Sequence, residues 1–364
     1  MKPWLLTLAL AEQAVGLSDP NPRVGCVIVS ADGKAILGQG HTQAAGGPHA
    51  EVMALRDAQA RGHDVRGATV YVTLEPCAHH GRTPPCCDAL VAAGVGRVEI
   101  AVGDPNPLVN GQGTARIAAA GIAIAHAPAD IALRARELNI GFFSRMERGR
   151  PWVRMKIAAS LDGRTALPNG ASQWITGPDA RTDGHAFRRR AGAVLTGIGT
   201  VLADDPVLDV RLVDTARQPL RAVVDARLDT PPTARLFDAA SPVLLFTAST
   251  DAARRAALQA RGAELVDVPM HAGRLDPGAV LDALAARHVN ELHVEAGARL
   301  NGALLRTGRV DELLLYLAPT LLGDGRAMAA LGAFESLAQG LPFDFHDATK
   351  VGADLRILAR SRLA

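Results

Sequence analysis

The sequence predicts an α/β protein made of two domains, and three observations lead to this prediction. The chain has 364 residues, more than twice the ~150 residues of a usual domain. Apolar runs with strand character alternate with helical patterns along the chain, which is typical of sheets covered by helices. A polar stretch at residues 147–151 separates two such series. We therefore expect one domain over residues 1–146 and a second over residues 147–364.

Composition narrows the class of protein. An apolar content of 48% and a charged content of 21% are those of an ordinary globular chain. No apolar run reaches the ~20 residues of a membrane span, the first 17 residues lack a signal cleavage site, and four cysteines are too few for a disulfide framework. Residues 1–146 carry 12 basic and 12 acidic side chains, without the basic excess of a nucleic-acid-binding domain. We expect a cytoplasmic protein with no membrane or nucleic-acid partner, and leave homo-oligomer formation open.

The first domain shows helix and strand patterns in alternation from its start. The expected helices cover residues 3–15, a segment from 49, a segment from about 86, 114–120 and 131–146. The expected strands cover residues 25–30, 34–38, 68–74, 98–103 and 122–125. Such alternation predicts a largely parallel sheet with helices on both faces.

The second domain continues the alternation after the polar stretch. Its expected strands cover residues 152–159, 193–196, 221–224, 243–247, 291–295 and 313–317. A helical run follows at 300–306. No internal repeat with a period of 20–50 residues occurs, so a solenoid is excluded.

Three residues of the first domain have the side chains expected of a zinc site. His49 precedes a helical pattern, Cys77 follows a predicted strand, and Cys86 opens another helical pattern. Zinc prefers imidazole nitrogen and thiolate sulfur, and three protein ligands leave a fourth position for water. A helix beginning near Cys86 would also direct its positive end at the thiolates and favour their ionised form. We therefore expect a catalytic zinc centre.

Glu51 is the expected proton carrier of this centre. Residues i and i+2 of a helix point to different sides, so His49 and Glu51 can share a site only where the helix begins. His-x-Glu with Pro-Cys-x-x-Cys is the signature of zinc deaminases, in which the glutamate is not a metal ligand. This chain departs from that signature, with eight residues between Cys77 and Cys86. We expect Glu51 to move protons from water to leaving ammonia.

The longer spacing leaves a structural zinc site as an alternative. Cys87 would then be the fourth ligand, but adjacent cysteines rarely both bind one zinc ion. We expect Cys87 to be a small buried residue and Cys26, inside an apolar strand, to belong to the core. Metal removal would distinguish the two interpretations, because loss of a structural zinc unfolds its domain.

The second domain lacks the glycine fingerprint of a Rossmann dinucleotide site. The run Gly197-Ile198-Gly199-Thr200 has no third glycine at the required spacing. A glycine between the strand at 291–295 and the helical run at 300–306 could still direct backbone N–H groups at a phosphate. A simple turn is the alternative.

Several motifs together closely resemble the bifunctional riboflavin-biosynthesis deaminase/reductase family. In the first domain they are Leu74–Cys86, Pro20–Gly25 and Gly103–Pro107, and in the second Lys156–Arg164, Ser172–Thr176, Thr200–Pro206 and Val294–Gly297. The resemblance spans nearly the whole chain. It implies a cytidine-deaminase-like α/β/α sandwich followed by a dihydrofolate-reductase-like α/β domain, with one zinc ion and NADPH as cofactors.

For the deaminase site, the resemblance assigns zinc to His49, Cys77 and Cys86, and the proton shuttle to Glu51. It places in the substrate pocket Asn21, His41, His79, Arg82, Asp104 and Asn106. Each has an alternative: Asn21 and Asn106 could form turns between prolines, Asp104 could cap a turn, and Arg82 could be a solvated charge. His80 competes with His79 for one role.

For the reductase site, the resemblance implies two sets of contacts. NADPH would be bound by Ala158, Trp174, Thr200, Asp204, Gly297, Ala298, Arg299 and Leu300, and the substrate by Ser172, Arg188, Leu208, Arg211 and Glu295. Arg188 and Arg211 suit a phosphate, because a guanidinium group can donate two parallel hydrogen bonds. The alternatives are a solvated helix face for residues 188–190, a core position for Trp174 and a strand-end surface charge for Lys156.

The resulting hypothesis is a two-step enzyme acting on a small pyrimidine ribosyl phosphate. The first step would be hydrolytic deamination of 2,5-diamino-6-ribosylamino-4(3H)-pyrimidinone 5′-phosphate. The second would be NADPH-dependent reduction of the ribosyl group, giving 5-amino-6-ribitylamino-uracil 5′-phosphate. The alternatives are a deaminase fused to an inactive scaffold, a deaminase of tRNA, which the near-neutral first domain disfavours, and a zinc-stabilised binding module.

Overall fold

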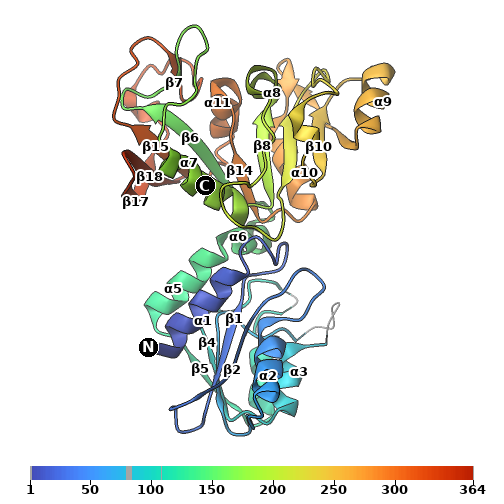
Figure 1. The fold of residues 1–364 in the computed structure, drawn as a ribbon, viewed down its shortest axis with the longest axis vertical. Coiled ribbons are helices and arrows are strands. Elements are labelled where there is room, and N and C mark those ends of the chain that lie inside the picture. The colour runs from blue at the N-terminus through green and yellow to red at the C-terminus, as the bar shows by residue number, and fades with distance from the viewer. Residues whose placement is uncertain (1, 79–83, 108, 364) are drawn as a thin grey trace. The chain divides into compact units, whose positions relative to one another are not determined.

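The chain forms two compact units, Met1–Gly149 and Arg150–Ala364. The computed structural model describes residues 2–78, 84–107 and 109–363 (Figure 1). The last helix of the first unit, α6, covers Ile140–Arg148. The first unit therefore extends past residue 146, the end expected from the sequence.

The first unit is a five-stranded sheet between two layers of helices. Its strands, in the order β2-β1-β3-β4-β5, are β1 (Gly25–Val29), β2 (Ile36–His41), β3 (Thr69–Val72), β4 (Arg97–Ile100) and β5 (Ala123–His126). Its other helices are α1 (Lys2–Gln13), α2 (Ala50–Ala60), α3 (Cys86–Ala92), α4 (Gln112–Ala119) and α5 (Ala129–Leu138). Figure 1 shows α1 and α5 on one side of the sheet and α2 and α3 on the other. This confirms the α/β/α sandwich.

The direction of the strands differs from the expected largely parallel sheet. β3, β4 and β5 are parallel, but β1 is antiparallel to both β2 and β3. A short hairpin joins β1 to β2 and forces them antiparallel. The crossover through α2 then places β3 on the far side of β1, running in the same direction as β2. The expectation was therefore wrong for two of the four strand pairs.

The helix expected over residues 131–146 is two helices, α5 and α6, separated at Asn139. The Asn139 side chain is buried and pairs with the backbone of Arg23. Its Oδ1 accepts from the Arg23 N–H at 2.7 Å, and its Nδ2 donates to the Arg23 carbonyl at 2.9 Å. This long-range contact interrupts the helix, and a periodic pattern could not reveal it.

The second unit contains a nine-stranded mixed sheet. Its strands, in the order β11-β10-β9-β8-β14-β6-β15-β18-β17, are β6 (Trp152–Ser160), β8 (Ala193–Gly197), β9 (Leu220–Val224), β10 (Val243–Thr247), β11 (Ala263–Asp267), β14 (Glu291–Val294), β15 (Glu312–Ala318), β17 (Phe343–Val351) and β18 (Asp354–Ser361). Neighbouring strands from β11 to β15 are parallel, whereas β18 is antiparallel to both β15 and β17. Short strands β7 (Arg164–Ala166) and β16 (Arg326–Ala327) pair separately, as do β12 (Met270–His271) and β13 (Arg274–Leu275).

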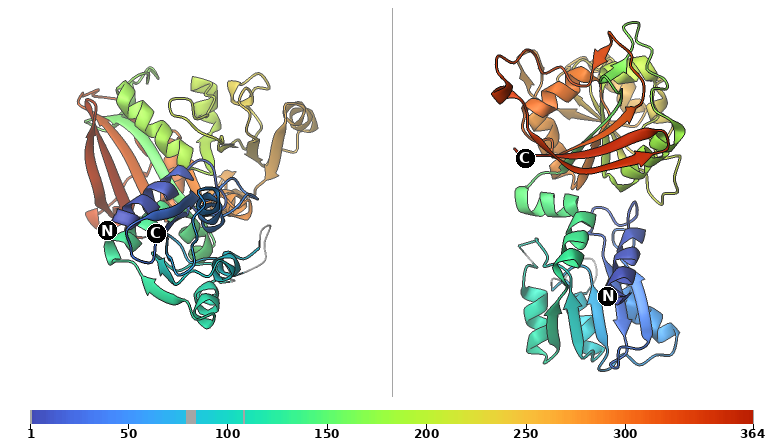
Figure 2. Two further views of the ribbon diagram at one scale, coloured as in Figure 1. Left: turned by 60° about the horizontal axis from the view of Figure 1, so that its bottom comes forward. Right: turned by 90° about the vertical axis from the view of Figure 1, so that its left-hand side faces the viewer.

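Helices cover both faces of this sheet (Figure 2). They are α7 (Pro178–Arg190), α8 (Ile198–Asp204), α9 (Ala252–Ala260), α10 (Pro277–Ala286) and α11 (Ala298–Arg306). Alternation along β15 shows the two layers: Leu315 packs into the core with α10 and α11, whereas Leu314 and Tyr316 pack against Ala180 of α7. No helix of the described residues is both long and apolar enough to span a bilayer.

Candidate active sites

His49, Cys77 and Cys86, which we call the His49 cluster, converge in the first unit. His49 immediately precedes α2, Cys77 lies on the loop after β3, and Cys86 is the first residue of α3. His49 Nδ1 lies 3.6 Å from the Cys77 sulfur and 3.3 Å from the Cys86 sulfur. All three candidate ligand atoms lie within 4.8 Å of one another, and no other such group of three or more occurs in the described part of the chain.

The start of α3 holds the two cysteines of this cluster in place. The Cys86 N–H donates to the Cys77 sulfur at 3.4 Å, and the Cys87 N–H donates to the Cys77 carbonyl at 3.2 Å. Cys87 itself is buried, and its thiol donates to Asp88 instead of pointing at His49. Cys26 is fully buried in the core, as expected.

The electrostatics of the cluster favour a thiolate beside a charged imidazole. Hydrogen bonds from Cys86 and His49 lower the pKa of Cys77 to about 4. The hydrogen bond to Cys77 raises the pKa of His49, and the same pairing, with burial, raises the pKa of Cys86. One nitrogen and two sulfur donors in this arrangement fit the preferences of zinc, which binds thiolate and imidazole in tetrahedral sites.

Glu51 lies in the first turn of α2 beside the cluster. Its side chain is 3% exposed. Burial, together with the negative charge of Cys77, raises the pKa of the Glu51 carboxyl to about 7. A carboxyl group with a pKa near neutrality can both accept and return a proton at physiological pH.

Asp104, one of the residues expected in the deaminase pocket, is buried, and the charge of Cys77 acts on its carboxyl group. Burial raises its pKa to about 6, with contributions from the charges of Glu75 and Cys77. Its Oδ1 accepts from the Asn106 N–H at 2.8 Å, so Asp104 does cap a turn, the alternative considered for it. Asn21 is half-buried and its N–H donates to the Ser18 carbonyl. His79 and Arg82 lie outside the described residues.

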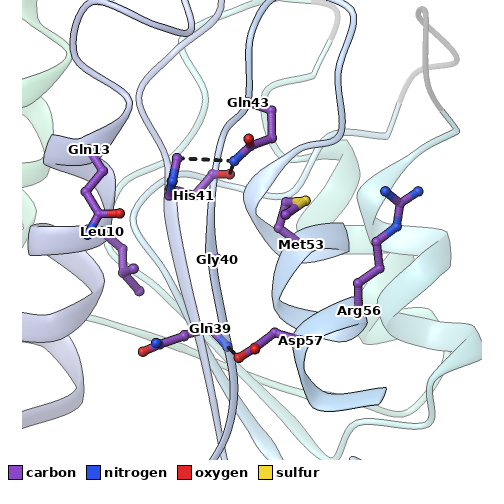
Figure 3. Close-up of a pocket in the computed structure, with 9 residues that line it drawn as sticks. All are labelled: Leu10, Gln13, Gln39, Gly40, His41, Gln43, Met53, Arg56 and Asp57. Atoms are coloured by element: carbon purple, nitrogen blue, oxygen red, sulfur yellow. Dashed lines mark hydrogen bonds between the residues drawn. The ribbon is translucent and has the colours of Figure 1, made fainter. Parts of the chain in front are cut away.

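His41 lies in a pocket on the outer side of β2, of about 410 Å³ (Figure 3). Gln43 donates to the His41 carbonyl at 2.9 Å. The pocket is lined by Leu10, Gln13, Gln39, Gly40, His41, Gln43, Met53, Arg56 and Asp57. The residues that line it include neither Glu51 nor any member of the His49 cluster.

In the second unit, Lys156, Arg188 and Glu295, which we call the Glu295 cluster, come from β6, α7 and the end of β14. Arg188 donates to both carboxylate oxygens of Glu295, and the Lys156 ammonium lies 3.8 Å from Glu295 Oε2. Burial would raise the pKa of Glu295, yet Arg188 and Lys156 hold it well below its usual range. The solvated-face alternative is wrong for Arg188, and the surface-charge alternative is wrong for Lys156.

The segment after α8 brings two further predicted residues to this cluster. Asp209 accepts from Arg188 through its carbonyl at 2.7 Å and from Arg211 through its carboxylate at 2.6 Å. Leu208 is buried, and its φ of 58° is in the left-handed region, which turns the backbone of this segment sharply. The Arg211 N–H donates to His185 of α7. His185 gave no signal in the sequence, because a single histidine in a helix is usually structural.

Several of the expected cofactor residues lie where β8 and β14 end. These neighbouring parallel strands lead into α8 through Gly197 and into α11 through Gly297, and neither helix start has a side-chain cap. Open space surrounds the position that a Cβ of Gly297 would take. N–H groups without a side-chain cap and an open backbone fit the phosphates of a dinucleotide. Thr200 and Asp204 lie in α8, Ala298, Arg299 and Leu300 in the first turn of α11, and Ala158 in β6.

Ser172 and Trp174 lie on the segment between β7 and α7. The Trp174 side chain is 65% exposed, so the core alternative for it is wrong. The guanidinium group of Arg181 lies 4.7 Å from its ring centroid. An exposed indole held by a cation offers a flat apolar surface for stacking.

Comparisons with protein families and curated proteins cover both units. A family model described as the RibD C-terminal domain matches residues 151–357, and one described as the cytidine and deoxycytidylate deaminase zinc-binding region matches residues 2–102. The riboflavin biosynthesis protein RibD of Escherichia coli (strain K12) is 45% identical over 96% of this chain and 95% of its own. That of Aquifex aeolicus is 38% identical over 97% and 96%.

Solved structures show the same similarity. Acinetobacter baumannii RibD, form 1, matches with a TM-score of 0.89 and 40% identity over 98% of this chain and 97% of its own. A diaminohydroxyphosphoribosylaminopyrimidine deaminase/5-amino-6-(5-phosphoribosylamino)uracil reductase from Thermotoga maritima matches with a TM-score of 0.86 and 30% identity over 98% and 97%. Both cover the two units together.

Proposed function

Because this chain belongs to the RibD family of riboflavin biosynthesis, with a zinc-dependent deaminase and an NADPH-dependent reductase activity, we propose specific reactions and residues for its two sites. The unit Met1–Gly149 deaminates 2,5-diamino-6-ribosylamino-4(3H)-pyrimidinone 5′-phosphate. The unit Arg150–Ala364 then reduces the ribosyl group to ribityl. The observation that carries the proposal is the His49 cluster beside a buried Glu51 whose pKa is about 7.

In the deaminase site, one set of residues holds the metal ion and another residue transfers protons. His49, Cys77 and Cys86 hold the zinc ion, which when bound activates water as a nucleophile at neutral pH. Glu51 accepts a proton at its carboxylate and delivers it to the departing amino group, which leaves as ammonia. Asn21, Asp104 and Asn106 orient the pyrimidine, and His79, Arg82 and His41 complete the proposed substrate set.

In the reductase site, the residues bind and orient two molecules. NADPH, when bound, supplies the hydride, and the starts of α8 and α11 hold its phosphates. Arg211 and Arg188 bind the substrate phosphate, while Glu295 orients the ribosyl group. Ser172 and Leu208 complete the substrate contacts, and Trp174 covers the cofactor and excludes water.

The proposal also includes the cellular compartment and the binding partners of the protein. The substrate is a small molecule, and nucleic acid and membrane have no part in the reaction. The four cysteines are all free thiols, which suits the reducing cytoplasm. There the protein would keep the thiolates needed for zinc.

The test is to follow both reactions in one preparation. Purified protein loaded with zinc is incubated with the diaminopyrimidine ribosyl phosphate, and ammonia and the nicotinamide absorbance are recorded with and without NADPH. We expect ammonia release without NADPH, and NADPH oxidation only after ammonia has formed. Ammonia release without any NADPH oxidation would leave a deaminase on an inactive scaffold and contradict the proposal.

A further inference from the structure

Glu75 is a buried carboxylate that neither reaction uses. It lies three residues after the end of β3 and two residues before Cys77, and its side chain belongs to the buried polar residues of the first unit. Its backbone N–H donates to the Val102 carbonyl at 2.9 Å, which continues the pairing of β3 with β4. A carboxylate is costly to bury unless its charge is compensated, so its partners indicate its role.

The carboxylate of Glu75 accepts four hydrogen bonds, all from the segment that follows β4. Oε2 accepts from the N–H of Asp104 at 3.3 Å and of Gly111 at 3.0 Å. Oε1 accepts from the N–H and the hydroxyl of Thr114, both at 3.0 Å. No basic side chain of the described residues pairs with it, and these four hydrogen bonds help to compensate its charge.

These bonds fasten two loops to each other. One loop carries Cys77, and the other carries Asp104 and Asn106, the residues proposed to hold the pyrimidine. The approach is close: a Cβ at Gly113, in the first turn of α4, would lie 1.8 Å from the Pro76 carbonyl. Glycine at position 113 therefore permits the contact, and Glu75 fixes it.

The zinc ligands have anchors of their own. Cys77 is held by the N–H groups of Cys86 and Cys87, and His49 by the start of α2. Loss of the Glu75 carboxylate would therefore release the segment with Asp104 and Asn106 while leaving the metal ligands in place. The consequence would appear in substrate binding.

We propose that Glu75 is a positioning residue of the deaminase, which sets the Asp104–Asn106 segment against the zinc-ligand loop for binding of the pyrimidine substrate. This inference rests on the proposed function of Asp104 and Asn106. Because those residues bind the substrate equally before and during reaction, displacing them raises KM and leaves kcat nearly unchanged.

The test uses Glu75→Gln in the full-length, zinc-loaded protein. The amide keeps one acceptor oxygen but turns an NH₂ group toward N–H donors, so one pair of hydrogen bonds is lost. We expect KM for the diaminopyrimidine ribosyl phosphate to rise about 10- to 100-fold, with kcat changed less than about threefold. Zinc content should stay at one per chain. Glu99→Gln, on the neighbouring strand, removes the carboxylate that pairs with exposed Arg97; it is the matched control and should change neither constant.

Thr114→Val removes one of the four bonds and should raise KM about two- to fivefold. If Glu75→Gln does not fold, the Thr114→Val variant tests the inference instead, and an unchanged KM in Thr114→Val would overturn it. So would a Glu75→Gln protein that folds with an unchanged KM, or one that loses zinc and kcat together.

Asp104→Asn separates this inference from the proposed function. If Asp104→Asn raises KM but Glu75→Gln does not, the positioning inference alone fails. If Asp104→Asn leaves KM unchanged, the proposed role of Asp104 fails, and the inference that rests on it fails as well.

Discussion

The His49 cluster and the Glu295 cluster are built in opposite ways. The first brings one nitrogen and two sulfur atoms within 4.8 Å of one another, with the buried carboxyl group of Glu51 beside them. The second consists of charges that already neutralise each other, since Arg188 donates to both oxygens of Glu295. One site is arranged to receive a metal ion, whereas the other, under the proposed function, would share its arginine with the substrate phosphate.

This difference affects how each site should respond to substitution. Removing a metal ligand leaves the remaining two without the ion that holds them together, so the loss should be nearly complete. Removing one charge from a paired cluster changes binding by the strength of one interaction. Substitutions in the two sites should therefore differ in size and in kind: loss of zinc and activity at the first, and weaker binding at the second.

Cys86→Ser should give the largest effect, because a hydroxyl is a poor zinc ligand compared with a thiolate. Bound zinc and deamination should both fall to background, and reduction of the deaminated substrate should continue. Cys87→Ser is the matched control, since its thiol faces Asp88. Metal analysis and ammonia assays decide the result, and equal zinc loss in both variants would make Cys87 a ligand.

Glu51→Gln should retain zinc yet deaminate about 10²–10⁴ times more slowly, because the amide cannot carry a proton. The measurement is kcat for ammonia release together with the zinc content of the same sample. NADPH oxidation with the deaminated substrate serves as the internal control. Zinc loss along with activity would instead make Glu51 structural.

Arg211→Ala should raise the reductase KM about 10- to 100-fold with kcat nearly unchanged, because a phosphate contact is equal in ground and transition states. Arg211→Lys should recover part of the loss, since an ammonium keeps the charge without the planar fork. Arg362→Ala removes an arginine from an exposed pair with Asp344 and is the control. A fall in kcat at saturating substrate would move Arg211 into the catalytic set.

The smallest expected effect concerns pH. Burial and the charges of Arg188 and Arg211 lower the pKa of His185 to about 4, so the folded protein keeps it neutral while the unfolded chain binds a proton below about pH 6.5. The free energy of unfolding should therefore fall as pH decreases from 6.5 toward 4, by about 1–2 kcal/mol between pH 7 and pH 5. Urea unfolding of the wild type and His185→Gln measures this, and an equal pH dependence in both would contradict it.

Element patterns in the sequence predicted most of the fold, because strands and helices carry local periodicity. The strand expected at 243–247 is β10 without change, and the first domain's predicted helices recur within a few residues. The break at Asn139 escaped prediction, because it depends on a contact with Arg23, 116 residues away. The direction of β1 was missed as well, since strand direction follows from connections and not from side-chain pattern.

The two sites differed in how far sequence could locate them. Histidine and cysteine have specialised chemistry, so the residue types at positions 49, 77 and 86 pointed to the His49 cluster even though the Cys77–Cys86 spacing departs from the usual signature. Arginine, lysine and glutamate occur on every surface, and only the family resemblance distinguished Arg188 and Glu295 from solvated charges. The sequence assigned no role to Lys156 or Glu75, because the residues they contact, Glu295 and Thr114, lie far away along the chain.

Removal of zinc from the full-length protein tests most directly whether one chain holds two separately built sites. The chelated protein is given the diaminopyrimidine ribosyl phosphate and, in a parallel sample, the deaminated ribosyl phosphate with NADPH. Ammonia release should stop and return when zinc is added, while NADPH oxidation with the deaminated substrate continues throughout. Loss of both activities together, or ammonia release that persists in protein shown to be free of zinc, would contradict the account.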